Sequence, residues 1–121
     1  MHKYDQTPST HTLSYDEFLK VDIRVGTVID VQDFPEARKP AYKILIDFGV
    51  EIGQKWSSSR ITDLYKKEDL LGKQVLAVVN FPPRQVGPMM SQVLTLGLEL
   101  EDNKVVVPTV EKPVPNGKRL Y

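Results

Sequence analysis

The sequence predicts an all-β domain with one hydrophobic core, and two observations support this class. Apolar and polar residues alternate with a period of two from Ile23 and again from Tyr42, as expected for half-buried strands. Prolines, glycines and charged residues then separate further apolar runs, which is typical of strands joined by turns. A length of 121 residues, 40% of them hydrophobic, suffices for one such domain.

The N-terminal part predicts a tail followed by a short helix. Residues 1–12 are rich in Thr, Ser, His and Pro and have no apolar period, so we expect a flexible tail. Ser14 and Glu17 then have the spacing of a capping box, which opens a helix that runs to Lys20. The apolar anchors of this helix are Phe18 and Leu19. Residues 13–121, including a proline-rich C-terminal extension, are expected to form a single domain.

Three strands are expected in the first half of the domain. The first covers residues 23–32, with its odd-numbered residues on one face and a bend or bulge at Gly26. The second covers residues 42–48, and Lys43 should lie on the opposite face of this strand from Tyr42. The third covers residues 54–58 and places Trp56 and Ser58 on one face. A connection rich in proline and charge joins the first two strands.

A helical connector and two more strands are expected in the second half. Residues 62–71 carry a cap candidate at Thr62 and apolar residues at helical spacing, and Gly72 stops the helix. Residues 74–81 and 91–98 supply strands four and five, with a loop between them. A turn at 101–103 leads into a short strand at 104–107, and the chain then runs extended over the surface.

This order of elements is that of an OB-fold, although other all-β arrangements also fit the pattern. The sequence predicts a five-stranded OB-fold barrel with a helix between strands three and four, a short N-terminal helix and a C-terminal extension. OB barrels bind oligonucleotides on the exposed face of strands two and three and in the loops that join strands one to two and four to five. Residues 82–90 form that second loop.

Composition excludes several kinds of chemistry. The chain has no cysteine, which excludes disulfides, thiolate catalysis and sulfur-ligated zinc and fits a reducing, cytoplasmic compartment. Its two histidines, His2 and His11, lie in the tail, so neither a Ser-His pair nor a histidine metal site is expected in the barrel. No nucleotide-binding fingerprint or long apolar run is present. We expect no enzyme, cofactor, metal or membrane insertion.

Charge must be unevenly placed if the domain binds nucleic acid, because 16 basic residues balance 16 acidic ones. Cations, amides and hydroxyls are the groups that position a nucleic-acid backbone. A solvated loop arginine, a turn-forming asparagine and an edge-strand serine run are the alternative interpretations. The candidate RNA-binding residues are Lys43, Lys55, Ser57, Ser58, Arg60, Asn80, Arg84 and Ser91, with Lys39 on the same basic side. The compensating acids expected elsewhere are Glu68, Asp69, Glu99, Glu101 and Asp102.

A second set of residues suggests a polypeptide-binding surface. Methionine repacks easily, and adaptable apolar rims are typical of proteins that bind many peptides. Packing in the core explains the tryptophan at least as well, and packing within the loop explains the methionines. The candidate peptide-binding residues are Trp56, Val86, Met89 and Met90.

Several sequence blocks resemble a known family. They are VDIRVGTVIDVQDFPEARKPAYKILIDFG, SSSRIT, VLAVVNFPPR, GPMMSQVLTLG and VPNGKR, which together cover about 18–119. In this order they resemble the CsaA group of small secretion-associated chaperones. That group belongs to the tRNA-binding domain family, which also occurs in methionyl-tRNA synthetases and endothelial monocyte-activating polypeptides. Two positions depart from the family pattern: Ser59 replaces a frequent alanine, and Gln92 replaces a usual glutamate.

The resemblance implies a homodimeric OB-fold protein that binds tRNA or unfolded, export-bound polypeptides, with helix and terminal segments at the dimer interface. A two-fold partner would also lengthen the short binding surface of one small barrel. The candidate contacts are Phe18, Leu19 and the proline-rich end near Val114. We therefore predict non-catalytic binding of tRNA or another structured RNA. An export-related chaperone that holds unfolded precursors in an apolar groove is the alternative.

Overall fold

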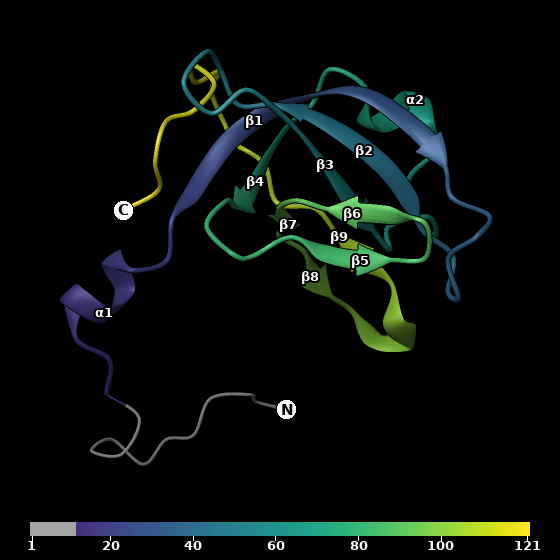
Figure 1. Ribbon diagram of the computed structural model, residues 1–121, viewed down its shortest axis with the longest axis horizontal. Helices are drawn as coiled ribbons and strands as arrows, with labels where there is room; N and C mark the ends of the chain where they lie inside the picture. Colours follow the sequence, from purple (N-terminus) through teal and green to yellow (C-terminus); the bar gives the residue numbers. More distant parts are fainter. Residues whose placement is uncertain (1–11) are drawn as a thin grey trace.

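The computed structural model describes residues 12–121, so the predicted tail lies outside the described residues apart from Thr12. Its main sheet has five antiparallel strands in the order β3-β2-β1-β4-β7 and curls into a nearly closed barrel (Figure 1). The all-β OB-fold prediction is confirmed. The elements are α1 (Tyr15–Leu19), β1 (Ile23–Asp33), β2 (Tyr42–Asp47), β3 (Gln54–Ser59), α2 (Lys67–Leu70), β4 (Gln74–Val78), β5 (Arg84–Val86), β6 (Met89–Ser91), β7 (Leu94–Thr95), β8 (Leu98–Glu99), η1 (Glu101–Asn103) and β9 (Val105–Val106).

The first strand is the centre of the sheet, because β1 pairs with β4 through its first half and with β2 through its second. The expected simple alternation along β1 is wrong: the register shifts between Val28 and Asp30, so that Val28 is buried and Ile29 is 40% exposed. The bulge lies here and not at Gly26. A Cβ at Gly26 would lie 2.5 Å from Ile46 Cγ2, so this glycine allows close packing inside the barrel.

The core lies inside the barrel, and β2 supplies much of it. The predicted alternation in β2 is confirmed, with Ile44 and Ile46 fully buried and Lys43 on the opposite side. Leu70 from α2 is also fully buried and covers one end of the barrel. The helix predicted at 62–71 is much shorter in the structure, where α2 begins after Lys66. The Lys66 amide donates a hydrogen bond to Asp69 Oδ2 at 2.8 Å and so caps this helix. Thr62 is therefore not the cap.

Short strands replace the long fourth and fifth strands that were predicted. The fourth strand ends at Val78, and the predicted fifth strand is divided among β6, β7 and β8. The expected loop between them contains a second, two-stranded sheet, in which Arg84 pairs with Ser91 and Val86 with Met89. On either side of this loop, β4 pairs with β7 in the main sheet. The predicted turn before β9 is also confirmed, and Asp102 has a positive φ of 68° there.

Side-chain hydrogen bonds close the barrel between β3 and the chain that follows β5. The Ser58 amide donates to Ser91 Oγ at 3.0 Å, and the Trp56 amide donates to Gln92 Oε1 at 2.8 Å. Thr95 Oγ1 donates to Ser57 Oγ at 2.8 Å. In β3, Ser57 lies in the core, and Trp56 and Ser58 are half-exposed on the other face. The predicted alternation in this strand is therefore confirmed.

The C-terminal extension adds to the free edge of β1. The Gly117 amide donates to the Val25 carbonyl at 2.8 Å, and the Val25 amide donates to the Lys118 carbonyl at 3.0 Å. Gln74 holds the same segment, because its side chain bonds both the amide and the carbonyl of Val114. Gly117 has φ +93°, and a Cβ there would lie 2.5 Å from the Phe48 carbonyl oxygen. The extension is therefore an ordered part of the domain.

The N-terminal helix lies apart from the barrel at the lower left of Figure 1. Its predicted capping box is confirmed: the Glu17 amide donates to Ser14 Oγ, and the Ser14 amide donates to Glu17 Oε1, both at 3.1 Å. None of its residues is buried, although Phe18 and Leu19 are half-buried. Arg119 donates to the Leu19 carbonyl and connects the helix to the C-terminal extension. No helix in the described range is long and apolar enough to cross a membrane.

Candidate nucleic-acid interface

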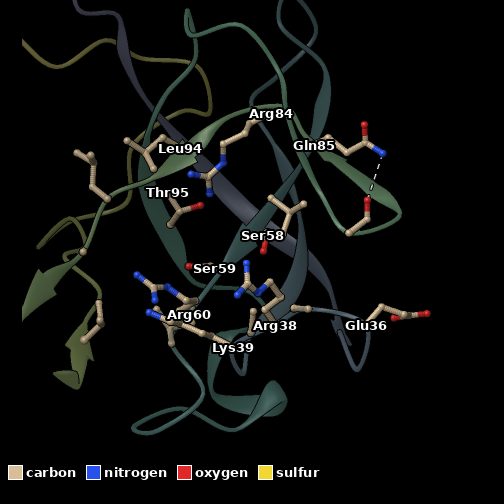
Figure 2. A pocket seen from close by; sticks show the side chains of 18 of the residues that line it. Glu36, Arg38, Lys39, Ser58, Ser59, Arg60, Arg84, Gln85, Leu94 and Thr95 are labelled. Atoms are coloured by element: carbon tan, nitrogen blue, oxygen red, sulfur yellow. Dashed lines mark hydrogen bonds between the residues drawn. The ribbon is translucent and has the colours of Figure 1, made fainter. Parts of the chain in front are cut away.

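A large hollow lies where the β1–β2 loop, the end of β3 and the β5–β6 hairpin meet, with a volume of about 1050 Å³. Four cationic side chains line it. Arg38 and Lys39 come from the loop, Arg60 follows β3, and Arg84 belongs to β5. Figure 2 shows Arg84 entering from one side and Arg38, Lys39 and Arg60 gathered at the other. We call this hollow the cationic hollow.

Electrostatics in the cationic hollow favour an anionic ligand. Within residues 12–121, none of its four cations forms an ion pair with an acidic side chain. Two carboxylates, Glu36 and Glu99, also line it, and Figure 2 shows Glu36 at its outer margin. The expectation that Glu99 lies away from the basic residues is therefore wrong. Cations still outnumber carboxylates by four to two.

The rest of the lining combines hydroxyl groups with an apolar floor. Ser58 and Thr95 provide hydroxyls from two different strands (Figure 2). Leu94, Leu96 and Val105 add aliphatic surface, and no aromatic ring from residues 12–121 lines the hollow. Cations around a hydroxyl-bearing hollow are suited to hold a phosphate backbone at several points. The lining offers no ring on which a base could stack.

The β5–β6 hairpin fixes the position of Arg84. Arg84 pairs with Ser91, whose hydroxyl accepts the hydrogen bond from the Ser58 amide. At the other end of the hairpin, Gly87 has φ +54°, and a Cβ there would lie 3.4 Å from the Glu36 carbonyl oxygen. The hairpin therefore touches both β3 and the β1–β2 loop, and Arg84 is presented from a strand rather than from a free loop.

The structure brings three of the eight predicted RNA-binding residues together in the cationic hollow, namely Ser58, Arg60 and Arg84. Ser57 and Ser91 are buried, and their hydroxyls are used in closing the barrel, so they do not offer surface groups. The sequence could not reveal this, because core-facing and outward serines look alike in a run of three.

Asn80 is placed by backbone contacts instead of facing the hollow. Its Oδ1 accepts from the Asp22 amide at 3.0 Å, and its Nδ2 donates to the Lys20 carbonyl at 2.7 Å. Both ends of the amide therefore connect the end of β4 to the chain before β1. These hydrogen bonds give Asn80 a structural role, and its RNA contact stays a prediction.

Two predicted lysines lie outside the cationic hollow, and one of its arginines was not predicted. Lys55 is half-exposed on β3, and Lys43 lines a neighbouring pocket. Arg38 was missed, although it stands beside Lys39 in the charged, proline-flanked connection after β1. That run of charge in a loop next to a sheet was the available signal.

The neighbouring pocket, of about 370 Å³, gathers most of the predicted peptide-binding residues. We call it the Trp-Met pocket. Of the four predicted residues, Trp56, Met89 and Met90 line it, whereas Val86 lines the cationic hollow. Its lining is Gln32, Lys43, Trp56, Met89, Met90 and Gln92.

Comparison with known proteins identifies the family. The family model of the tRNA-binding domain matches residues 23–119, which is most of the chain. The chain is a member of the tRNA-binding domain family. A methionine–tRNA ligase of Parabacteroides distasonis is 37% identical over 117 residues, which cover 97% of this chain and 17% of that protein. The chain thus spans about one sixth of the length of the curated relatives that it matches.

Solved structures of this family share the fold over almost the whole chain. The chaperone CsaA from Bacillus anthracis has a TM-score of 0.86 and 44% identity, covering 91% of this chain and 99% of that one. The CsaA chaperone protein from Picrophilus torridus has a TM-score of 0.84 and 45% identity, covering 91% and 100%. The methionyl-tRNA synthetase related protein from Pyrococcus horikoshii has a TM-score of 0.81 and 32% identity, covering 92% and 99%. These likenesses support the resemblance to the CsaA type of this family.

Metal binding finds no support in the part of the chain that the structure describes. No group of three or more His, Asp or Glu side chains is placed there so that it could hold a metal ion. Scattered carboxylates are engaged in local pairs instead. Asp22, for example, accepts from Arg24 Nε at 2.6 Å, and this hydrogen bond raises the pKa of Arg24 above its ordinary value.

Proposed function

We propose that this chain binds tRNA or another structured RNA without catalysis, through the cationic hollow. The observation that carries the proposal is the convergence of Arg38, Lys39, Arg60 and Arg84 on one hollow without acidic partners among residues 12–121. Membership of the tRNA-binding domain family supports the same ligand. Arginine and lysine at fixed positions on a rigid barrel recognise the spacing of phosphates, which is a property of RNA shape.

The predicted contact residues enter this proposal in two groups. Arg60, Arg84 and the Ser58 hydroxyl contact the RNA backbone directly, together with the two loop cations. Lys43 and Lys55 flank the hollow and add long-range attraction. The absence of cysteine from the chain fits a cytoplasmic location, which forms part of the proposal.

Filter binding of unmodified tRNA tests the proposal. We expect the double variant Arg60→Ala, Arg84→Ala to lose about 50-fold in affinity, because two charge-assisted contacts of about 1.2 kcal/mol each are removed. The matched control is Lys112→Ala, which removes an exposed cation of the C-terminal extension and should change affinity less than twofold. Equal losses in both variants would contradict a defined site.

A second candidate function is the holding of unfolded polypeptides. The observation that favours it is the gathering of Trp56, Met89 and Met90 around one pocket. The solved relatives from B. anthracis and P. torridus are described as chaperones, which is consistent with this activity. We expect the chain to slow aggregation of a denatured client and the variant Met89→Ser, Met90→Ser to lose this effect. Full activity of that variant would contradict the site.

We also propose that the chain forms a homodimer. Tyr15 is 63% exposed on α1 and Tyr121 is 90% exposed at the end of the extension, so each terminal segment presents a large side chain to a partner. Val114, the other expected contact, is instead held against its own barrel by Gln74. Sedimentation at micromolar concentration tests this: we expect a dimer, and a monomer would contradict it.

A further inference from the structure

The Trp-Met pocket is separate from the cationic hollow although the two are neighbours. The two linings have no residue in common. On the outer face of β3, Trp56 belongs to the first and Ser58, two residues further, to the second. Residues of β5 line the cationic hollow and Met89 and Met90 of β6 line the Trp-Met pocket, while Ser91 and Gln92 hold the hairpin to the edge of β3. The β5–β6 hairpin thus divides the surface into two sites.

The Trp-Met pocket has the size and surface for one large apolar side chain. Its volume of about 370 Å³ is near the lower end of small ligand pockets. Trp56 is held at the wall, since Gln92 bonds both its amide and its carbonyl, each at 2.8 Å. Met89 is half-buried and Met90 is 49% exposed, so adaptable side chains line the pocket beside a tryptophan whose backbone is fixed.

One cation gives this pocket a charge preference. Lys43 Nζ lies 5.2 Å from the centre of the Phe34 ring, which positions the ammonium group at the rim without neutralising it. No acidic residue of the described range lines the pocket. Asp30 lies two residues before Gln32, the residue that pairs with Lys43. Its carboxylate accepts a hydrogen bond from Gln32 Nε2 at 2.8 Å. A ligand that brings its own carboxylate beside its apolar group therefore complements the pocket.

We propose that the Trp-Met pocket is a second, independent site for a polypeptide segment in which a large aliphatic or aromatic residue is next to an acidic one. The apolar side chain packs between Trp56 and the two methionines, and the carboxylate pairs with Lys43. The pocket stays open while RNA occupies the cationic hollow. This rests on the second candidate function above and names its ligand class.

Two short peptides test the ligand preference. Trp56 is the single tryptophan of the chain, so 5-fluorotryptophan placed there gives one ¹⁹F resonance at the pocket. The probes are acetyl-Gly-Leu-Asp-Gly-amide and the same peptide with Asn in place of Asp. We expect the Asp peptide to shift this resonance saturably and to bind about three- to fivefold more tightly, as expected for one exposed ion pair. Lys43→Gln should remove the difference, and Lys39→Gln, in the other site, should keep it.

The independence of the two sites is tested with the same resonance. Peptide affinity should change less than twofold in the presence of saturating tRNA and in the variant Arg60→Ala, Arg84→Ala. Displacement of the peptide by tRNA, or loss of peptide binding in that variant, would overturn the proposal in favour of one shared site. A shift caused by uridine monophosphate but by neither peptide would assign the pocket to a base and also overturn it. If tRNA does not bind, only the RNA function is contradicted. The peptide affinity of the variant Arg60→Ala, Arg84→Ala then still tests whether the two sites are independent.

Discussion

Two regions of this molecule are held in place by different interactions, and they have different tasks. Strands β1 to β4 are joined by backbone ladders around a buried core. The chain from 80 to 100 forms only short strands and is attached to β3 largely through the side chains of Ser91, Gln92 and Thr95. This second region nevertheless carries Arg84 and both methionines. Backbone pairing is therefore concentrated in the first region, and the second region completes both candidate sites, whose other residues come largely from β1, β2, β3 and the adjoining loops.

The largest expected effect is on the first region. Gly26→Val should lower the free energy of unfolding by about 3 kcal/mol or more, because overpacking of a closed interior is costly. The added Cβ would lie 2.5 Å from Ile46 Cγ2 and 2.9 Å from the Asp47 carbonyl oxygen. Urea denaturation measures this. Gly53→Ala is the matched control: it has open space but φ +84°, and should cost about 1 kcal/mol. A Gly26 variant as stable as the control would contradict the packing described.

A smaller loss of stability should follow from opening the closure between the two regions. Ser91→Ala combined with Gln92→Ala removes the acceptors of the Ser58 and Trp56 amides and should cost about 2 kcal/mol. Hydrogen exchange at these two amides should accelerate more than at the β1–β2 ladder. Gln92→Glu, which restores the family's usual residue, keeps the acceptor and should remain as stable as the wild type. Uniform acceleration across the sheet would show that the regions are not distinct.

The same contrast explains what the sequence could predict. The strands β2 and β3 and their buried faces could be predicted from the alternation of apolar and polar residues, because one face of a barrel strand packs in the core. In β1 the bulge near Ile29 exchanges the faces, and period-two reasoning has no signal for it. The candidate site was readable by residue type for Arg60, Arg84 and the methionines.

Residues that work through side-chain hydrogen bonds were not readable. Asn80, Ser57 and Ser91 have the chemistry of surface groups, yet each satisfies a partner distant in sequence. Only the folded structure shows which partner a short polar side chain has found. The short strands after Asn80 also escaped prediction, because β5–β6 and β8–β9 are local hairpins of two or three residues per strand, too short for a clear alternation of apolar and polar residues.

Arg84→Ala should affect binding alone and so sharpens the comparison. Arg84 is exposed and forms no ion pair with another residue in the range 12–121, so the free energy of unfolding should change by less than about 0.5 kcal/mol. Affinity for tRNA should fall about eightfold, equivalent to about 1.2 kcal/mol. Filter binding and urea denaturation of the same preparation measure both. A loss of stability without a loss of tRNA affinity would show that Arg84 serves the fold and not RNA binding.

The smallest effect is expected at α1. Hydrogen bonds from the Ser14 amide and hydroxyl hold the pKa of Glu17 below its ordinary value of 4.5. The stabilisation of the helix is therefore complete above that value and is lost as pH falls through the lowered pKa. The protection factor of the Glu17 amide, which is its exchange rate corrected for the intrinsic effect of pH, should fall in that range when measured by NMR between pH 6 and 2. Ser14→Ala should show little protection at any pH, and an identical profile in both proteins would contradict the cap.

The central claim is that the cationic hollow binds an RNA backbone, and the salt dependence of tRNA affinity tests it most directly. Each phosphate contact contributes about 0.7 to 0.9 to the slope of log affinity against log salt concentration. We predict a linear fall for the wild-type chain and a slope smaller by about 3 in the variant in which Arg38, Lys39, Arg60 and Arg84 are all glutamine. An unchanged slope in that variant would contradict the account.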